Sequence, residues 1–150
     1  MSDLILLDTG PLGLVSNPQS NESNKQCNLW LEEQLAKGKR VLIPEIADYE
    51  LRRELIRAGK IKGIAKLNGL KRSLGYIPLT TRTMLRASDF WAQARRMGKP
   101  TAADAALDGD VILAAQAAII QDAGHKVVIA TANVKHLDLF TDARLWNDIT

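Results

Sequence analysis

The 150-residue sequence is poor in the residues that form disulfide bonds and zinc sites. It contains one cysteine, Cys27, and two histidines, His125 and His136. A single cysteine excludes an internal disulfide and fits a reducing compartment. Two histidines without a cysteine cluster argue against a zinc site of the usual kind. The sequence also lacks a phosphate-binding loop of the GxGxxG or GKS/GKT type, which argues against a nucleotide-binding module.

Long apolar runs are missing as well. The longest, VILAAQAAII, is too short to cross a bilayer and contains Gln116. At the amino end, Asp3 and Asp8 bracket only four apolar residues, without the basic segment that begins a signal peptide. With 46% apolar and 25% charged residues, the composition is that of a globular protein. We therefore expect one cytoplasmic domain over residues 1–150, without membrane contact.

Positive charge is concentrated in the middle of the chain. Residues 40–100 contain 14 Lys and Arg against 5 Asp and Glu, a balance of +9. The remaining residues contain 6 against 12, a balance of −6, and the two sum to the net charge of +3. A basic region favours a polyanion such as RNA lying against one face of the protein. A pair of solvated helices rich in Arg and Lys explains the same pattern.

Short apolar segments alternate with helical patterns along the chain. Strands are predicted at 4–7, 41–44, 75–80 and 126–131, with a last edge strand at 143–148. Helices are predicted at 28–37, 44–58, 61–74, 81–97, 110–123 and, briefly, 134–137, whereas 101–109 is predicted to be a loop with weak helical character. The apolar stripe of the second helix consists of Ile46, Tyr49, Leu51, Leu55 and Ile56. This alternation predicts an α/β fold in which helices cover both faces of a parallel sheet.

The first predicted strand runs directly into Asp8. An ionised carboxylate beside a core is costly unless a cation or hydrogen-bond donors compensate it. Ligands of parallel sheets bind outside the carboxyl ends of the strands. We therefore expect Asp8 at the functional edge, together with the residues that follow the second and fourth strands.

Three further residues are candidates to meet Asp8 there. Glu50 lies between apolar positions of the helix at 44–58, and Asp110 stands at the predicted start of an Ala-rich helix, where a helix cap or first-turn acid is the alternative. Asn133 follows the fourth strand, where a turn former is the alternative. Oxygen ligands of this kind suit Mg²⁺ or Mn²⁺, which activate water and neutralise phosphoryl charge.

Four stretches, in order, resemble PIN-domain ribonucleases, in particular VapC-type toxins of type II toxin–antitoxin systems: ILLDTGPLGLV, LIPEIADYELRREL, LDGDVILAAQA, and VVIATANVKHLDLF with a trailing ARLWND. The acids of the family fall on Asp8, Glu50 and Asp110, and a threonine falls on Thr131. The fourth acidic position falls on Asn133, a departure that makes this ligand neutral. The resemblance implies a three-layer α/β/α fold, Mg²⁺- or Mn²⁺-dependent cleavage of single-stranded RNA, an antitoxin partner and a homodimer.

The resemblance and the residue chemistry together assign roles. We expect Asp8 and Asp110 to bind the metal most directly, with Glu50 as a further ligand or as the base that orients water. Thr9 and Thr131 are expected to hydrogen-bond a carboxylate or a phosphate of the substrate.

Three arginines, Arg52, Arg53 and Arg57, follow Glu50 and either meet the RNA backbone or face solvent. A haloacid-dehalogenase-like phosphatase is disfavoured, because it needs an Asp where this chain has Gly10. The alternative that stays open is a catalytically inactive PIN-like domain that binds RNA or serves as a scaffold, since Asn133 is neutral.

Overall fold

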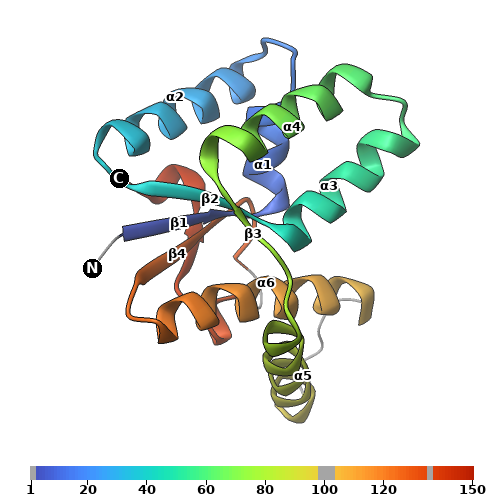
Figure 1. Cartoon of the computed structure of the whole chain (residues 1–150), viewed down its shortest axis with the longest axis vertical. Helices are drawn as coiled ribbons and strands as arrows, with labels where there is room; N and C mark the ends of the chain where they lie inside the picture. Colours follow the sequence, from blue (N-terminus) through green and yellow to red (C-terminus); the bar gives the residue numbers. More distant parts are fainter. Residues whose placement is uncertain (1–2, 98–103, 135–136) are drawn as a thin grey trace.

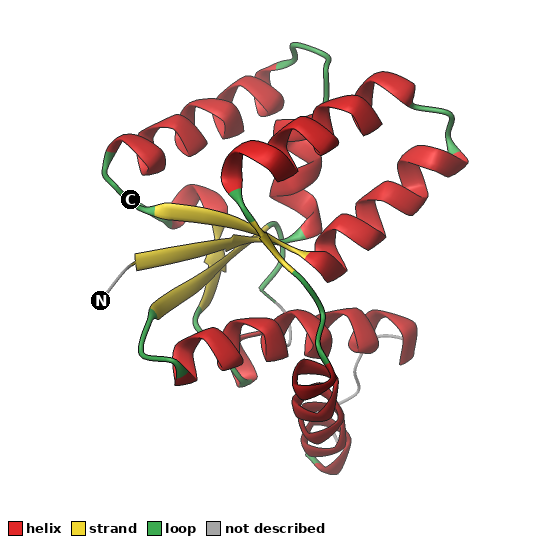
Figure 2. Ribbon diagram, in the orientation of Figure 1, coloured by secondary structure: helices red, strands yellow, loops and turns green. Residues whose placement is uncertain are grey.

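A parallel sheet forms the centre of the molecule (Figure 2). The computed structural model describes residues 3–97, 104–134 and 137–150. Its five strands lie in the order β3-β2-β1-β4-β5, and every neighbouring pair is parallel. The strands are β1 (Asp3–Leu7), β2 (Arg40–Pro44), β3 (Tyr76–Ile77), β4 (Lys126–Thr131) and β5 (Ala143–Leu145). The prediction of a central parallel sheet is confirmed.

Helices cover both faces of the sheet, as Figure 1 shows. One face carries α1 (Thr9–Ser16), α2 (Glu22–Ala36), α3 (Glu45–Arg57) and α4 (Ile61–Leu74), and the other carries α5 (Thr81–Arg96) and α6 (Asp104–Asp122). Short 3₁₀ helices span Leu137–Leu139 and Trp146–Asp148. Among the described helices, none has the length and apolar character needed to span a bilayer. The three-layer α/β/α fold is confirmed.

Side chains of β1 divide between two cores. Leu4 and Leu6 pack with α5 and α6, whereas Ile5 and Leu7 pack with α1, α2 and α4. All four are buried, as expected for a strand with helices on both sides. Burying each such side chain contributes about 1.5–3 kcal/mol. The central strand is therefore fixed from both faces, and with it the position of the residue that follows, Asp8.

Helix α1 is absent from the predicted pattern, because Gly10, Pro11 and Gly13 have poor helix propensity. Two features explain why it forms. Asp8 caps the helix, and Pro11 lies in the first turn, where a missing N–H breaks no helical hydrogen bond. Leu12 and Val15 are fully buried in the core, so tertiary packing outweighs propensity.

Two other helices begin earlier than predicted. Helix α2 starts at Glu22 because the Asn21 side chain accepts a hydrogen bond from the Asn24 N–H, at 2.9 Å. Helix α6 already includes Asp104, within the segment predicted to be a loop. Asp110 is therefore in the second turn of α6 or beyond, and the alternative that it caps the helix or lies in its first turn is wrong. The helix predicted at 134–137 falls partly outside the described residues.

Candidate active site

The carboxyl ends of β1 and β4 mark the point where the direction of strand order changes. From β1 the chain proceeds to β2 and β3 on one side, then crosses to β4 and β5 on the other. Ligands of open α/β sheets bind at such a switch point. Asp8 follows β1 directly and Thr131 ends β4, so the predicted functional edge contains the switch point.

Asp8 is held by three neutral groups. Its Oδ1 accepts a hydrogen bond from the Thr9 N–H at 2.7 Å, and its Oδ2 accepts one from the Thr131 hydroxyl at 2.7 Å. Its own N–H donates to the Ala130 carbonyl at 2.9 Å. These bonds orient the carboxylate and support it at the edge of the core, but they leave its negative charge in place.

A close approach between α1 and the segment after β4 brings Asp8 and Thr131 together. A Cβ atom added to Gly10 would lie 2.8 Å from the Cβ of Ala132, nearer than such atoms approach one another. Glycine is therefore required at position 10 for this packing. In the sequence, Gly10 is only a glycine two residues after Asp8. The reason for a glycine there is apparent only from the structure, in which Ala132 lies against it.

Glu50 connects α3 to two other helices. Its Oε1 accepts a hydrogen bond from the Thr9 hydroxyl at 3.0 Å. Its Oε2 lies against α6, where a Cβ added to Gly109 would be 2.6 Å from that oxygen. Glu50 is thus half-buried between the residue that follows Asp8 and the residue that precedes Asp110.

The pKa of Glu50 is raised above its ordinary value of 4.5. Burial is the main cause, and the negative charge of Asp8 adds to it, while the hydrogen bond from Thr9 and the charge of Arg53 act in the opposite direction. Burial and a neighbouring carboxylate both disfavour the ionised form. A cation beside Glu50 and Asp8 would relieve this repulsion.

The donor set fits a hard divalent cation, since Asp8, Glu50 and Asp110 are all half-buried carboxylates. Among the side chains that the structure describes, however, no three His, Cys, Asp or Glu residues form a group that could hold an ion as they stand. That the three carboxylates share one metal ion stays a prediction.

Thr131 and Asn133 form a turn at the end of β4. The Thr131 side chain is buried, and its hydroxyl accepts a hydrogen bond from the Asn133 N–H at 3.1 Å. The hydroxyl also lies 3.0 Å from the Asn133 carbonyl, but its single proton favours the shorter contact to Asp8. These bonds involve only the backbone of Asn133, whose side chain is exposed. A role for its amide at a metal stays a prediction.

The two threonines both donate to carboxylates, one of the two expectations for them: Thr9 to Glu50 and Thr131 to Asp8. Substrate contacts by either threonine remain predictions.

The arginines Arg52 and Arg53 differ from each other in their surroundings. Arg52 makes two hydrogen bonds to the buried carboxylate of Asp48, at 3.2 and 2.8 Å. Sequence reasoning missed this ion pair, although its i,i+4 spacing was a usable signal.

Arg53, in contrast, is exposed and carries its guanidinium over the ring of Tyr49, 5.0 Å from the ring centroid. It also lies near enough to Glu50 for its charge to influence that carboxyl. Arg57 is also exposed and pairs with Glu54, so Arg53 is the predicted RNA-binding arginine that faces solvent close to Glu50. Contact of any of these arginines with RNA stays a prediction.

No protein-family profile and no curated protein sequence matches the chain. Solved structures do. A chain of VapBC2 from Rickettsia felis, bound to a DNA fragment from its promoter, is similar with a TM-score of 0.69 and 17% identity, over 95% of this chain and 98% of that one. A chain of FitAcB from Neisseria gonorrhoeae gives a TM-score of 0.69 and 19% identity, over 97% and 99%.

DNA-bound VapBC from Salmonella typhimurium contains a further similar chain, with a TM-score of 0.64 and 18% identity, over 97% of this chain and 99% of that one. Identities this low establish the fold, and they do so over nearly the full length of both partners. The fold of these chains is the one that the four sequence motifs, in their order along the chain, predict. The chain therefore has a PIN-like α/β fold, the fold of the matching chains in these VapBC and FitAcB structures.

Proposed function

We propose that this protein is a divalent-metal-dependent endoribonuclease that cleaves single-stranded RNA in the cytoplasm, as the toxin of a toxin–antitoxin pair. The observation that carries the proposal is the position of Glu50. It lies half-buried at the switch point, near the charge of Asp8 and against the residue before Asp110, with a raised pKa. Groups with perturbed pKa values concentrate at functional sites.

Asp8, Asp110 and Glu50 would hold Mg²⁺ or Mn²⁺. When bound, such an ion lowers the pKa of a water molecule and neutralises charge on a phosphoryl oxygen. The hydroxyls of Thr9 and Thr131 keep the carboxylates of Glu50 and Asp8 in fixed orientations. Burial and the charge of Asp8 raise the pKa of Glu50, which suits this carboxylate to take a proton from an attacking water.

Asn133 would contribute a neutral oxygen to this site, directly or through water. With one carboxylate fewer, the site should hold one ion well, and a second ion would arrive with the RNA phosphate. Asn133→Asp should then bind Mn²⁺ more tightly than the wild type in the absence of RNA. Equal affinity and stoichiometry in the two proteins would place position 133 away from the metal.

Cleavage of a labelled single-stranded RNA by the purified protein tests the proposal. The wild type should cut only with Mg²⁺ or Mn²⁺, Asp8→Asn should not cut, and Asp89→Asn, an exposed acid on α5, should cut like the wild type. RNA that is bound but left intact by the metal-loaded wild type would instead support the alternative, an inactive PIN-like domain that binds RNA or serves as a scaffold.

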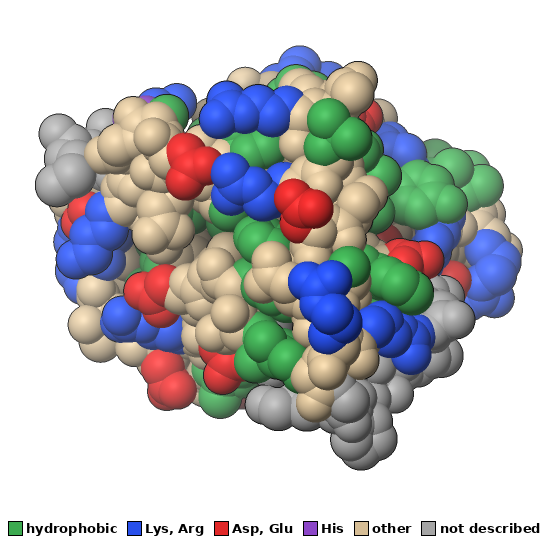
Figure 3. All heavy atoms as spheres, turned by 90° about the horizontal axis from the view of Figure 1, so that it is seen from below, with side chains coloured by type: hydrophobic (Ala, Val, Ile, Leu, Met, Phe, Trp, Pro, Cys, Tyr) green, Lys and Arg blue, Asp and Glu red, His purple; other side chains and the backbone are tan. Residues whose placement is uncertain are grey.

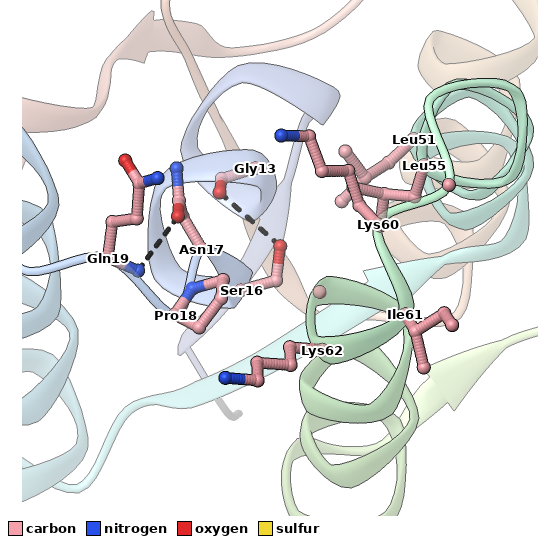
Figure 4. Close-up of a pocket in the computed structure, with 12 residues that line it drawn as sticks. Gly13, Ser16, Asn17, Pro18, Gln19, Leu51, Leu55, Lys60, Ile61 and Lys62 are labelled. Atoms are coloured by element: carbon pink, nitrogen blue, oxygen red, sulfur yellow. Dashed lines mark hydrogen bonds between the residues drawn. The ribbon is translucent and has the colours of Figure 1, made fainter.

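An antitoxin is the proposed protein partner, and a cavity of about 720 Å³ between α1, α3 and α4 is its proposed groove (Figure 4). Leu51 and Leu55 form an apolar wall, and Lys60 and Lys62 supply positive charge. These walls suit a peptide with acidic and apolar side chains. The similar solved chains belong to VapBC and FitAB complexes, which supports a partner of this kind.

Expression of the wild type should arrest growth unless the antitoxin is co-expressed. Lys62→Glu should weaken the complex while RNA cleavage continues, because its charge would repel an acidic peptide. Lys37→Glu, at the far end of α2, is the matched control. Overexpression of an RNA-cleaving wild type without any growth defect would count against the toxin assignment.

A homodimer is also proposed, following the family resemblance. Figure 3 shows hydrophobic side chains interleaved with charged ones on the side of the molecule that carries α5 and α6. Three large apolar side chains of α5 are exposed: Met84, Leu85 and Trp91. Sedimentation velocity should find a dimer for the wild type and a monomer for Leu85→Glu. A monomeric wild type at the highest attainable concentration would contradict the proposal.

A further inference from the structure

Tyr49 occupies an unexpected position. The sequence pattern places it in the apolar stripe of α3, yet 55% of its surface is exposed. It directly precedes Glu50, and its ring lies under the guanidinium of Arg53. An exposed aromatic ring paired with a cation, next to a candidate catalytic carboxylate, calls for an explanation other than core packing.

The geometry of the helix links the ring to the site. Successive residues of an α-helix are about 100° apart around its axis. Arg53 is four residues after Tyr49 and three after Glu50, so it projects between them. The order around α3 is therefore aromatic ring, guanidinium, carboxylate, and the charge of Arg53 reaches Glu50. A strand of RNA whose phosphate lies at the carboxylates would have a neighbouring base within reach of this pair.

We propose that Tyr49 and Arg53 form a stacking subsite for one nucleobase of the RNA substrate, adjacent to the cleavage site. This inference rests on the proposed ribonuclease function. Single-stranded RNA is commonly recognised by stacking of unpaired bases on aromatic rings and guanidinium planes. Because every base has a π face, such a subsite holds the strand without selecting its sequence.

RNA fits this surface better than a protein does. On α3, which the structure describes completely, the exposed large apolar side chains are Tyr49 and Ile56, and Arg53 lies between them. Two side chains separated by a cation fall far short of the roughly 800 Å² that each partner buries in a stable protein interface. The same helix lies in the segment of residues 40–100 with its balance of +9, which attracts a polyanion.

A second tyrosine shows what a structural ring–cation pair looks like in this fold. Lys71 lies over the ring of Tyr76, 3.9 Å from the centroid. Tyr76 is half-buried, and burial together with a hydrogen bond to Glu45 raises the pKa of its hydroxyl. Its ring is therefore already packed, whereas the ring of Tyr49 is available for stacking.

The test measures binding of a short fluorescent single-stranded RNA to Asp8→Asn protein, which should leave the RNA uncut. The same oligonucleotide is also prepared with one abasic position, moved along the strand. Adding Tyr49→Ala should weaken binding of the intact RNA by about 5- to 100-fold, the loss expected for one base stacked on an aromatic ring. Tyr49→Phe should bind like the parent, and Ile56→Ala, on the same exposed face, is the matched control.

One abasic position should weaken binding to the parent protein but not to the Tyr49→Ala variant, because the ring that the base would stack on is already missing. Equal affinity of Tyr49→Ala and its parent for intact RNA would overturn the proposal. So would a change from dimer to monomer in Tyr49→Ala with unchanged RNA affinity, since the ring would then belong to a protein interface. Failure of the ribonuclease function is separate: the wild type itself would then leave RNA uncut.

Discussion

Two acids on the same helix, Asp48 and Glu50, have opposite electrostatic surroundings. Asp48 is 6% exposed, and Arg52 neutralises it through two hydrogen bonds. Glu50 is half-buried and lies near the charge of Asp8, and both effects raise its pKa, although the hydrogen bond from the neutral Thr9 hydroxyl acts in the opposite direction. One carboxylate is compensated within the fold, and the other keeps an excess of negative charge that an ion could relieve.

The difference separates an acid that stabilises the fold from an acid that serves the site. A buried ion pair costs much free energy when one member is removed, because the other is left uncompensated. Removing a repelled carboxylate costs the fold little and can even stabilise it. Substitutions at the two places should therefore move stability and activity in different directions, which the following experiments exploit.

Asp8→Asn should have the largest effect. Loss of a metal-binding carboxylate at the reacting centre removes several kcal/mol of transition-state stabilisation, so RNA cleavage should fall by roughly 10³-fold. The asparagine side chain keeps an oxygen that can cap α1, so thermal unfolding should change little. Cleavage within tenfold of wild type, by protein with an unchanged melting temperature, would remove Asp8 from the chemistry.

Asp48→Asn should act mainly on stability. It breaks a largely buried ion pair with Arg52, whose side chain is 26% exposed, so the free energy of unfolding should fall by about 1–3 kcal/mol in urea titrations. Cleavage per folded molecule should stay the same. Glu54→Gln breaks the solvent-exposed pair with Arg57 and should leave stability unchanged. A loss of cleavage by folded Asp48→Asn protein would contradict the view that Asp48 serves only the fold whereas Glu50 serves the site.

Gly109→Ala tests the position of Glu50 without changing an acid. The new Cβ would lie 2.6 Å from the Glu50 Oε2, so the carboxylate must move aside while the flexible side chain spares the fold. A displacement of about 1 Å costs up to 10²-fold in rate, and cleavage should fall by about 10- to 100-fold. Gly69→Ala, with open space around it in α4, is the control and should only stabilise its helix. Equal cleavage in both variants would show that the contact does not matter.

Glu50→Gln should change the pH dependence of stability, the smallest of the four effects. Because the folded pKa lies above 4.5, the folded protein retains a proton that the unfolded chain has released just above that pH. This contribution therefore lowers stability as pH rises from 4.5 through the raised pKa, and is constant above it. Urea titrations from pH 4.5 upward should show this fall in the free energy of unfolding in the wild type, and should not show it in Glu50→Gln. Parallel profiles would contradict a raised pKa.

The sequence predicts the features of the fold that depend on local patterns. Apolar segments of four to six residues mark the main strands, and the rule that strand ends meet at one edge places Asp8 and Thr131 together. Helix α1 escapes prediction because packing of Leu12 outweighs the poor propensity of its glycines and proline. The contact between Gly109 and Glu50 escapes it because the two residues are 59 positions apart and no local signal links them.

Titration of Mn²⁺ into wild type, Glu50→Gln and Asp48→Asn by calorimetry tests the central claim most directly, that the switch-point acids form a divalent-metal site. We expect the wild type to bind one ion, Asp48→Asn to bind it with the same affinity, and Glu50→Gln to bind it at least about tenfold more weakly, a difference of about 1.4 kcal/mol. Absence of Mn²⁺ binding by the wild type, or equal affinity in the wild type and Glu50→Gln, would contradict the account.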